Sequence, residues 1–102
     1  MPDGHGLWKL AGFEEAFEQW LIRESPSADV SLAVAEWMLS RAEDPYEGAR
    51  REPGFPDLWT ARIRGTAEGR RTKFNMVLCT FRVLEPEHVV SCDNFATLGY
   101  PV

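Results

Sequence analysis

Two arginines, Arg62 and Arg64, are separated by one residue in a segment where apolar and polar side chains alternate. Successive side chains of a β-strand point to opposite faces. A strand over residues 58–64 would therefore hold both guanidinium groups on one face and its apolar residues on the other. Guanidinium groups on an open face can bind a phosphate or another anion. The pattern predicts either an anion-binding surface or a solvated sheet face.

Charge is unevenly distributed along the chain, whose formal net charge is −5. Residues 1–49 hold ten acidic and three basic residues, whereas residues 50–82 hold eight of the eleven basic residues and three acidic ones. Residues 83–102 hold three acidic residues and no basic one. This segregation fits a basic face for a polyanion, and it fits equally well acidic helices that neutralise a basic sheet in the same molecule.

Further residues could act on a bound phosphate. Arg82 lies on the polar side of the next predicted strand, although Asp93 is a diagonal cross-strand neighbour that could form an ion pair with it. His88 lies in a predicted loop, where an imidazole either transfers protons or is simply solvated. Other basic residues flank the loops, where they could clamp phosphates or keep the loops hydrated: Arg50, Arg51, Arg70, Arg71 and Lys73.

Several classes of function are disfavoured by what the sequence lacks. Cys79 and Cys92 belong to no CxxC motif and no Cys/His cluster, so no metal site is expected. There is no Ser/His/Asp set and no glycine-rich phosphate loop, so no cofactor is expected. No apolar run approaches the roughly 18 residues of a membrane span, and the N-terminus does not resemble a signal peptide. We expect one cytoplasmic domain with no membrane contact.

Apolar residues recur with helical spacing in two stretches, one beginning at Phe13 and one ending before Asp44-Pro45. Between them, Ser25-Pro26-Ser27 ends the first helix, and a serine cap followed by proline at the first helical position starts the second. The sequence therefore predicts an antiparallel helical hairpin. The apolar stripes are Phe13, Ala16, Phe17, Trp20 and Leu21 in the first helix, and Val30, Ala33, Val34, Trp37 and Met38 in the second.

Three strands are predicted in the second half of the chain, at residues 58–64, 74–84 and 89–93. Residues 45–57, with three prolines and two glycines, are predicted as an ordered but irregular loop. The glycine-bearing residues 65–72 are predicted as a long, basic connection.

The last two strands form a hairpin whose register can be predicted. A four-residue loop over residues 85–88 gathers the apolar residues on one face and the polar residues on the other. Cys79 then lies opposite Asn94 rather than Cys92, so no disulfide is expected. The register pairs Leu84 with Val89, Val83 with Val90, Arg82 with Ser91, Phe81 with Cys92, and Thr80 with Asp93.

The helical stripes and the apolar sheet face need a partner surface, and each can cover the other. The expected fold is therefore α+β, with the helical hairpin packed on one face of a three- to four-stranded antiparallel sheet. A possible fourth strand is a short edge strand at residues 7–10. The opposite face of the sheet would hold Arg62, Arg64 and Arg82.

This order of elements resembles the RelE/ParE toxin superfamily of toxin–antitoxin systems. The segments that carry the resemblance are EGARREPGFPDLWTARIRG and VLCTFRVLEPEHVVSCD. The resemblance implies an antitoxin partner. In the RelE branch it implies cleavage of mRNA on the ribosome, by attack of a ribose 2′-OH on the adjacent phosphate. In the ParE branch it implies binding to DNA gyrase.

The resemblance also implies roles for single residues. Arg62 and Arg64 match basic positions on the first strand after the helices, and Arg82 lies near a basic or tyrosine position of the next strand. In a nuclease these arginines would stabilise the scissile phosphate, with His88 or Tyr100 as proton acceptor. The tail after Asp93 carries no basic residue, unlike that of the nucleases. This leaves open a non-enzymatic binding module, either of the gyrase-inhibitor type or an inactive toxin homologue.

Overall fold

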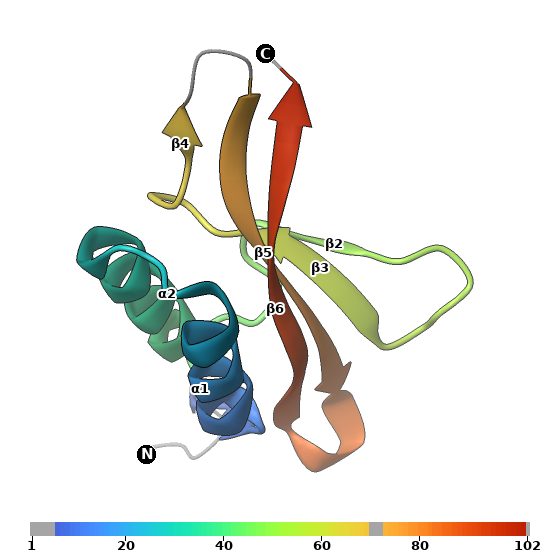
Figure 1. The fold of residues 1–102 in the computed structure, drawn as a ribbon. Coiled ribbons are helices and arrows are strands. Elements are labelled where there is room, and N and C mark those ends of the chain that lie inside the picture. Colours follow the sequence, from blue (N-terminus) through green and yellow to red (C-terminus); the bar gives the residue numbers. More distant parts are fainter. Residues whose placement is uncertain (1–5, 70–72, 102) are drawn as a thin grey trace.

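The computed structural model describes residues 6–69 and 73–101 (Figure 1). A 3₁₀ turn over Glu85–Glu87 joins the last two strands. In chain order the helices and strands are β1 (Lys9–Ala11), α1 (Phe13–Glu24), α2 (Ala28–Ser40), β2 (Ala49–Arg51), β3 (Leu58–Arg62), β4 (Glu68–Gly69), β5 (Lys73–Leu84) and β6 (Val89–Pro101).

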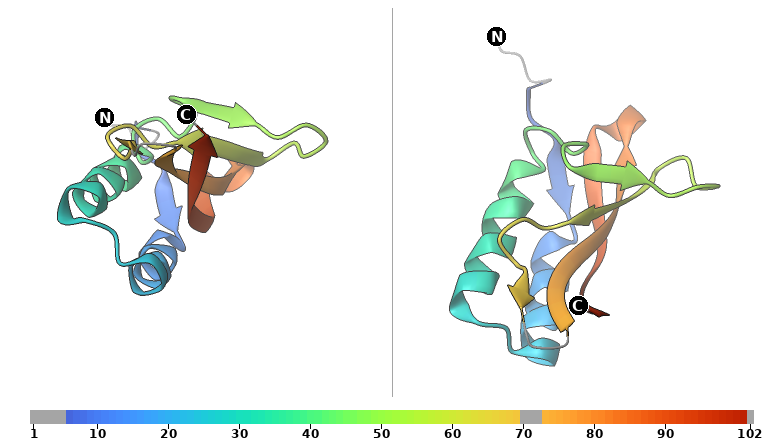
Figure 2. Two further views of the ribbon diagram at one scale, coloured as in Figure 1. Left: turned by 45° about the horizontal axis from the view of Figure 1, so that its top comes forward. Right: turned by 90° about the horizontal axis from the view of Figure 1, so that it is seen from above.

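The strands form one mixed sheet in the order β1-β6-β5-β3-β2, and β4 pairs with β5. β1 runs parallel to β6, and the other neighbours are antiparallel. Both helices lie on one side of this sheet, and the loop between β2 and β3 projects away from them (Figure 2). The expected α+β architecture is confirmed, with more strands than expected. β2 lies within the predicted irregular loop, and β4 lies within the predicted basic connection.

The two helices bury the predicted apolar stripes against the sheet. Trp20 and Val34 are fully buried, and Phe13 and Val30 nearly so. They pack with inward-facing sheet residues in one hydrophobic cluster whose buried members include Ala61, Ile63, Val77, Cys79, Phe81, Val83, Val90, Cys92 and Phe95. Among the described residues, no helix is long and apolar enough to cross a membrane.

The break between the helices differs in detail from the prediction. Ser25 ends α1 with a φ of 44°, whereas Ser27 is the cap of α2 and accepts a hydrogen bond from the Val30 backbone N–H at 3.2 Å. Ser27 is the residue immediately before the helix, so its hydroxyl reaches the unsatisfied N–H groups of the first turn.

The β5–β6 register follows the prediction from the loop up to Phe81, which lies opposite Cys92. Beyond that pair a β-bulge leaves Asp93 without a paired residue on β5, so Thr80 lies opposite Asn94 rather than Asp93. The bulge exists because Cys92 and Phe95 both face the core, and two residues between them break the two-residue period of a strand.

The bulge also changes the environment of the cysteines. Cys79 lies opposite Phe95, so the prediction that it lies opposite Asn94 is wrong. The Sγ atoms of Cys79 and Cys92 are 3.7 Å apart, and both residues are buried free cysteines. The two thiols therefore meet within the core on adjacent strands.

Candidate anion-binding site

Arg62 and Arg64 lie at the end of β3, next to the C-terminal half of the helical hairpin. β3 ends at Arg62, two residues earlier than predicted. Arg64 lies beyond the strand with its side chain 87% exposed, and its guanidinium contacts Glu47 Oε2 at 3.1 Å. The two arginines are therefore not held side by side on a regular strand. Both nevertheless line the same hollow.

Two adjoining hollows share Arg62 and Gly48, and together we call them the Arg62 groove. The first, of about 390 Å³, lies between α2 and the end of β3, and the second, of about 410 Å³, lies over β2 and β3. The first is lined by Ala33, Glu36, Trp37, Glu47, Gly48, Arg62, Arg64 and Gly65. The second is lined by Gly48, Ala49, Arg50, Glu52, Thr60, Arg62 and Leu78.

The second hollow combines cationic and proton-accepting groups. Arg50 lies opposite Thr60 in the β2–β3 ladder, so both side chains belong to the sheet face remote from the helices. The Thr60 hydroxyl donates a hydrogen bond to Glu52 Oε2 at 2.7 Å. Arg50 and Arg62 thus line one hollow with a carboxylate whose orientation Thr60 fixes. Guanidinium groups can stabilise negative charge on a phosphate, and a carboxylate can accept a proton.

Glu47 lines the first hollow and forms ion pairs with two arginines. One carboxylate oxygen contacts Arg64, and the other contacts the Arg41 guanidinium at 3.4 Å. Arg41 is buried with a side-chain exposure of 1%, and it donates hydrogen bonds to the carbonyls of Pro45 and Glu47 at 3.1 and 2.7 Å. Burial lowers the pKa of Arg41, and Glu47 opposes that shift. The buried arginine therefore anchors the carboxylate that positions Arg64.

Arg82 belongs to another part of the sheet face. Its guanidinium contacts Asp57 Oδ1 at 3.0 Å and Asp93 Oδ2 at 3.8 Å. The predicted alternative, an ion pair with Asp93, is confirmed. Arg82 lies opposite Leu58 at the start of β3, away from Arg62 at its end. Its charge is compensated by two carboxylates outside the Arg62 groove.

His88 also lies away from the Arg62 groove. It follows the 3₁₀ turn after β5, with a φ of 57°, and its ring stacks on Trp8 with centroids 4.0 Å apart. Its Nε2 atom is buried without a hydrogen-bond partner among the described residues. Arg62 pairs with Leu78 of β5, six residues before the end of that strand at Leu84. At about 3.3 Å per residue, the part of β5 from Leu78 to Leu84 is about 20 Å long, and it separates Arg62 from the turn that holds His88.

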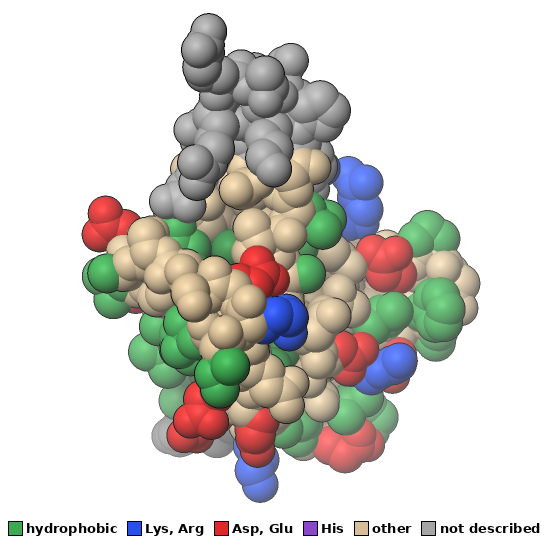
Figure 3. All heavy atoms as spheres, viewed as in Figure 1, with side chains coloured by type: hydrophobic (Ala, Val, Ile, Leu, Met, Phe, Trp, Pro, Cys, Tyr) green, Lys and Arg blue, Asp and Glu red, His purple; other side chains and the backbone are tan. Residues whose placement is uncertain are grey.

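The remaining candidates divide between the two faces and the undescribed part of the chain. Arg50 lines the Arg62 groove, whereas Arg51 lies opposite Trp59 and lines a separate hollow with Tyr46 and Glu85. On the face shown in Figure 3, basic side chains are scattered among acidic and apolar ones. Arg70 and Arg71 lie outside the described residues, as do the side chains of Lys73 and Tyr100.

Sequence reasoning missed Glu52 and Thr60 as members of this site. Glu52 falls in the segment predicted to be irregular, so no face could be assigned to it. Alternation along the predicted strand over residues 58–64 puts Thr60 on the same face as Arg62, but a hydroxyl on a strand is no signal by itself. Residues 6–69 and 73–101 contain no group of three His, Cys, Asp or Glu residues that could hold a metal ion.

The elements around the groove define a class of fold: a helical hairpin on one face of a mixed sheet whose long final hairpin ends the chain. A search of solved structures finds this arrangement in a variant of the Escherichia coli toxin RelE in its free state, with a TM-score of 0.58 and 15% sequence identity. The match covers 88% of this chain and 82% of the other. The chain therefore has a RelE-like fold, as the sequence predicted.

Neither the protein-family models nor the curated proteins gave a match.

Proposed function

We propose that this protein is a RelE-like toxin that cleaves mRNA on the ribosome at the Arg62 groove. One observation carries the proposal. Arg62 lies between two hollows that also hold Arg50, Arg64 and the Glu52 carboxylate, at the end of a sheet in a RelE-like fold. The solved structure with this fold is of a toxin.

The proposed step needs no cofactor. The Glu52 carboxylate accepts the proton of a ribose 2′-OH, and the 2′ oxygen attacks the adjacent phosphorus. The P–O5′ bond breaks as the new P–O bond forms, which leaves a 2′,3′-cyclic phosphate, and the departing 5′ oxygen takes a proton from water. Arg62 and Arg50 stabilise the negative charge that develops on the phosphoryl oxygens. Thr60 positions the Glu52 carboxylate through its hydrogen bond.

The first test is to map mRNA 5′ ends in a translating extract with wild-type protein and the Arg62→Ala variant. Loss of a donor that stabilises a developing charge lowers the rate by about 100- to 1,000-fold, so cleavage by the variant should almost disappear. The matched control is Lys9→Ala, because Lys9 is an exposed cation on β1, at the opposite edge of the sheet. Unchanged cleavage by Arg62→Ala would remove the assignment of this site.

A second candidate is a binding module without catalysis, either of the gyrase-inhibitor type or an inactive toxin homologue. The observation that favours it is that Arg82 is engaged by Asp57 and Asp93, and His88 by Trp8, so neither contributes to the Arg62 groove. A DNA supercoiling assay with purified gyrase distinguishes the two functions. Inhibited supercoiling together with intact mRNA would support the second candidate.

A toxin of this kind would act in the cytoplasm and would be held by an antitoxin. Large apolar side chains on both helices remain exposed, with Ile22 83%, Leu32 59% and Leu39 70% exposed. An antitoxin segment could cover these side chains. Co-expression with the product of a neighbouring gene, followed by co-purification, tests this partner.

A further inference from the structure

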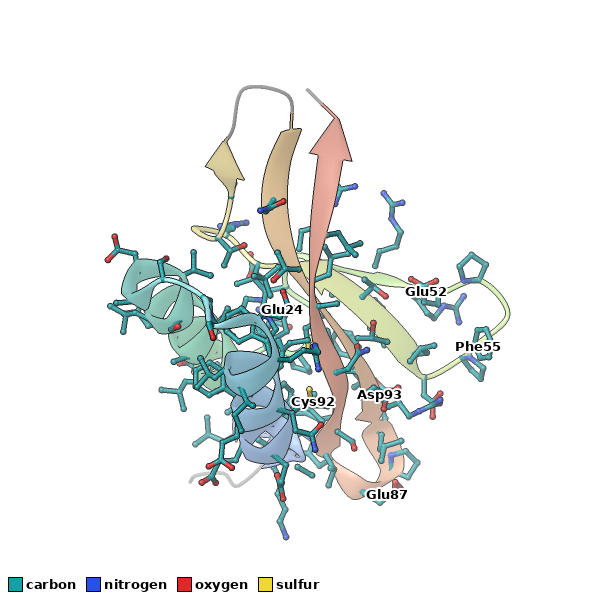
Figure 4. The ribbon with its side chains drawn as sticks, in the orientation of Figure 1. Glu24, Glu52, Phe55, Glu87, Cys92 and Asp93 are labelled. Atoms are coloured by element: carbon teal, nitrogen blue, oxygen red, sulfur yellow. The ribbon has the colours of Figure 1, made fainter. Side chains whose placement is uncertain are left out.

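The loop between β2 and β3 presents an aromatic side chain to solvent. Phe55 is 53% exposed, although it is a large hydrophobic residue, and it is not part of the core cluster of the described residues. Figure 4 places Phe55 on the loop that projects from the sheet away from both helices, with Glu52 nearer to the sheet. Apolar atoms also reach the surface at this projection in Figure 3.

The loop is held in a defined shape. The backbone N–H of Glu52 donates to the Leu58 carbonyl at 2.8 Å, and the N–H of Phe55 donates to the Glu52 carbonyl at 3.2 Å. Pro53 and Pro56 lie on the two sides of Phe55, and proline restricts backbone rotation. Gly54 has a φ of 83°, which closes the turn at the tip. A preorganised loop loses little conformational entropy when its exposed ring binds a partner.

The charges around the loop favour a polyanion as that partner. Arg50 and Arg51 are exposed, and among the described residues neither forms an ion pair. Of the two acidic residues nearby, Asp57 forms an ion pair with Arg82, whereas Glu52 accepts a hydrogen bond from the neutral Thr60 hydroxyl. Strand β2, which leads into the loop, therefore supplies two guanidinium groups, Arg50 on the groove face and Arg51 on the opposite face.

We infer that Phe55 is a base-stacking residue, and that the β2–β3 loop binds an unpaired nucleobase of single-stranded RNA. The inference rests on the proposed function, because Arg50 lies on strand β2, which leads into this loop, and also lines the Arg62 groove. Phe55 is seven residues before Arg62, which places the two at most about 23 Å apart at about 3.3 Å per residue. A phosphate at Arg62 and a base at Phe55 would therefore belong to nucleotides several positions apart on one strand. Aromatic stacking and nearby arginines are the means by which proteins hold single-stranded RNA.

The test measures the affinity of the purified protein for a fluorescently labelled single-stranded RNA by fluorescence anisotropy. All riboses of the RNA carry 2′-O-methyl groups, so the RNA cannot be cleaved through a 2′-OH. Phe55→Ala should weaken binding about tenfold, because a stacked base contributes about 1–3 kcal/mol and 1.4 kcal/mol corresponds to tenfold. Phe55→Trp should retain the affinity, and Phe55→Leu should lose most of it, because leucine is apolar but has no π-face.

The matched control is Leu7→Ala, because Leu7 is an apolar residue with 64% exposure that precedes β1, at the opposite edge of the sheet from β2. It should leave RNA affinity unchanged. Circular dichroism of each variant confirms that the fold is intact. A duplex of the same sequence should bind without dependence on Phe55, because its bases are already stacked.

Three outcomes overturn the inference. They are no binding of single-stranded RNA by the wild-type protein, equal binding by Phe55→Ala, and full affinity of Phe55→Leu, which would indicate an apolar contact such as a protein pocket makes. The result is separable from that of the proposed function. Phe55-dependent binding without cleavage in the translating extract supports the stacking residue and overturns the nuclease. Arg62-dependent cleavage with Phe55-independent binding overturns the stacking residue alone.

Discussion

The Tyr46 side chain connects strand β3 with the 3₁₀ turn between β5 and β6. Its ring packs edge-on against Trp59 with centroids 4.9 Å apart, and its hydroxyl donates a hydrogen bond to Glu85. Burial, followed by the interaction with Glu85, raises the pKa of Tyr46 to about 12. The ordinary pKa of a tyrosine is about 10. The folded protein therefore favours the neutral phenol.

This shift predicts how stability depends on pH. Because the folded-state pKa of Tyr46 is raised, its contribution to stability is complete below about pH 10 and is lost as the pH rises through about 12. The measurement is a titration of phenolate absorbance for wild type minus Tyr46→Phe, with urea unfolding at several alkaline pH values. The difference titration should have its midpoint near 12, and a midpoint near 10 would contradict the environment described for Tyr46.

Single residues differ in how well the sequence predicts their roles. The ion pair of Arg82 with Asp93 follows from the predicted hairpin, although the bulge takes Asp93 out of the ladder. The burial of Arg41 does not follow from the sequence, because an arginine after a helix is ordinarily solvated at the helix C-terminus. The buried Arg41 guanidinium donates to the carbonyls of Pro45 and Glu47. The conformation of the loop after α2, which places these carbonyls, depends on tertiary packing.

Among the elements, the junction of β1 and α1 depends on a glycine. Gly12 has a φ of 76°, and a Cβ atom added there would lie 3.1 Å from the backbone oxygen of Cys92. Gly54 has a φ of 83° but has nothing within 4 Å of the added atom. Comparing the two glycines separates the effect of backbone conformation from that of crowding.

Gly54→Ala should lower the free energy of unfolding by about 1–2 kcal/mol, the strain of a left-handed conformation. Gly12→Ala should lower it by about 1–3 kcal/mol more, because the β6 backbone must also move. Urea denaturation of both variants provides the measurement. Equal losses would show that β1 and α1 can shift away from β6 without strain.

The elements that the sequence predicted correctly are those in which an apolar pattern recurs over many residues. Both helices and the β5–β6 register near the loop follow from apolar stripes that recur over several turns or residue pairs. β2 was missed because its sequence is Ala-Arg-Arg, which has no alternating apolar pattern, and its pairing depends on the neighbouring strand β3. The parallel pairing of β1 with β6 was missed because three residues carry no directional signal.

At the scale of the whole molecule, the uneven charge distribution gives a prediction for salt dependence. If Arg50, Arg62 and Arg64 neutralise three phosphates of single-stranded RNA, the logarithm of the affinity should fall with the logarithm of salt concentration with a slope of about −2. Arg50→Ala should reduce the steepness by about 0.7, whereas Phe55→Ala should lower the affinity and leave the slope unchanged. Anisotropy titrations at several potassium chloride concentrations provide both numbers. Equal slopes for wild type and Arg50→Ala would exclude a phosphate contact by Arg50.

The molecule also shows why the site was only partly predictable. Arg50, Arg62 and Arg64 line one groove because β2, which the sequence did not predict, pairs with β3. The segregation of charge along the sequence could not show that Arg82 is compensated or that His88 lies about 20 Å away along β5. The partners of Arg82 and the position of His88 depend on how the strands pair in the sheet. A count of charges along the sequence carries no information about that pairing.

The lack of a cross-strand partner for Asp93 in the β5–β6 ladder has a consequence for changes in chain length. Deleting Asp93 would remove one of the two residues between Cys92 and Phe95, so both would still face the core while the ladder became regular. Deleting Ala96 instead would turn every later side chain of β6 to the opposite face of the sheet. Thr97 would then no longer accept the hydrogen bond of the Trp20 indole. Length variation in homologous chains should therefore be accepted at the middle of β6 and excluded a few residues later.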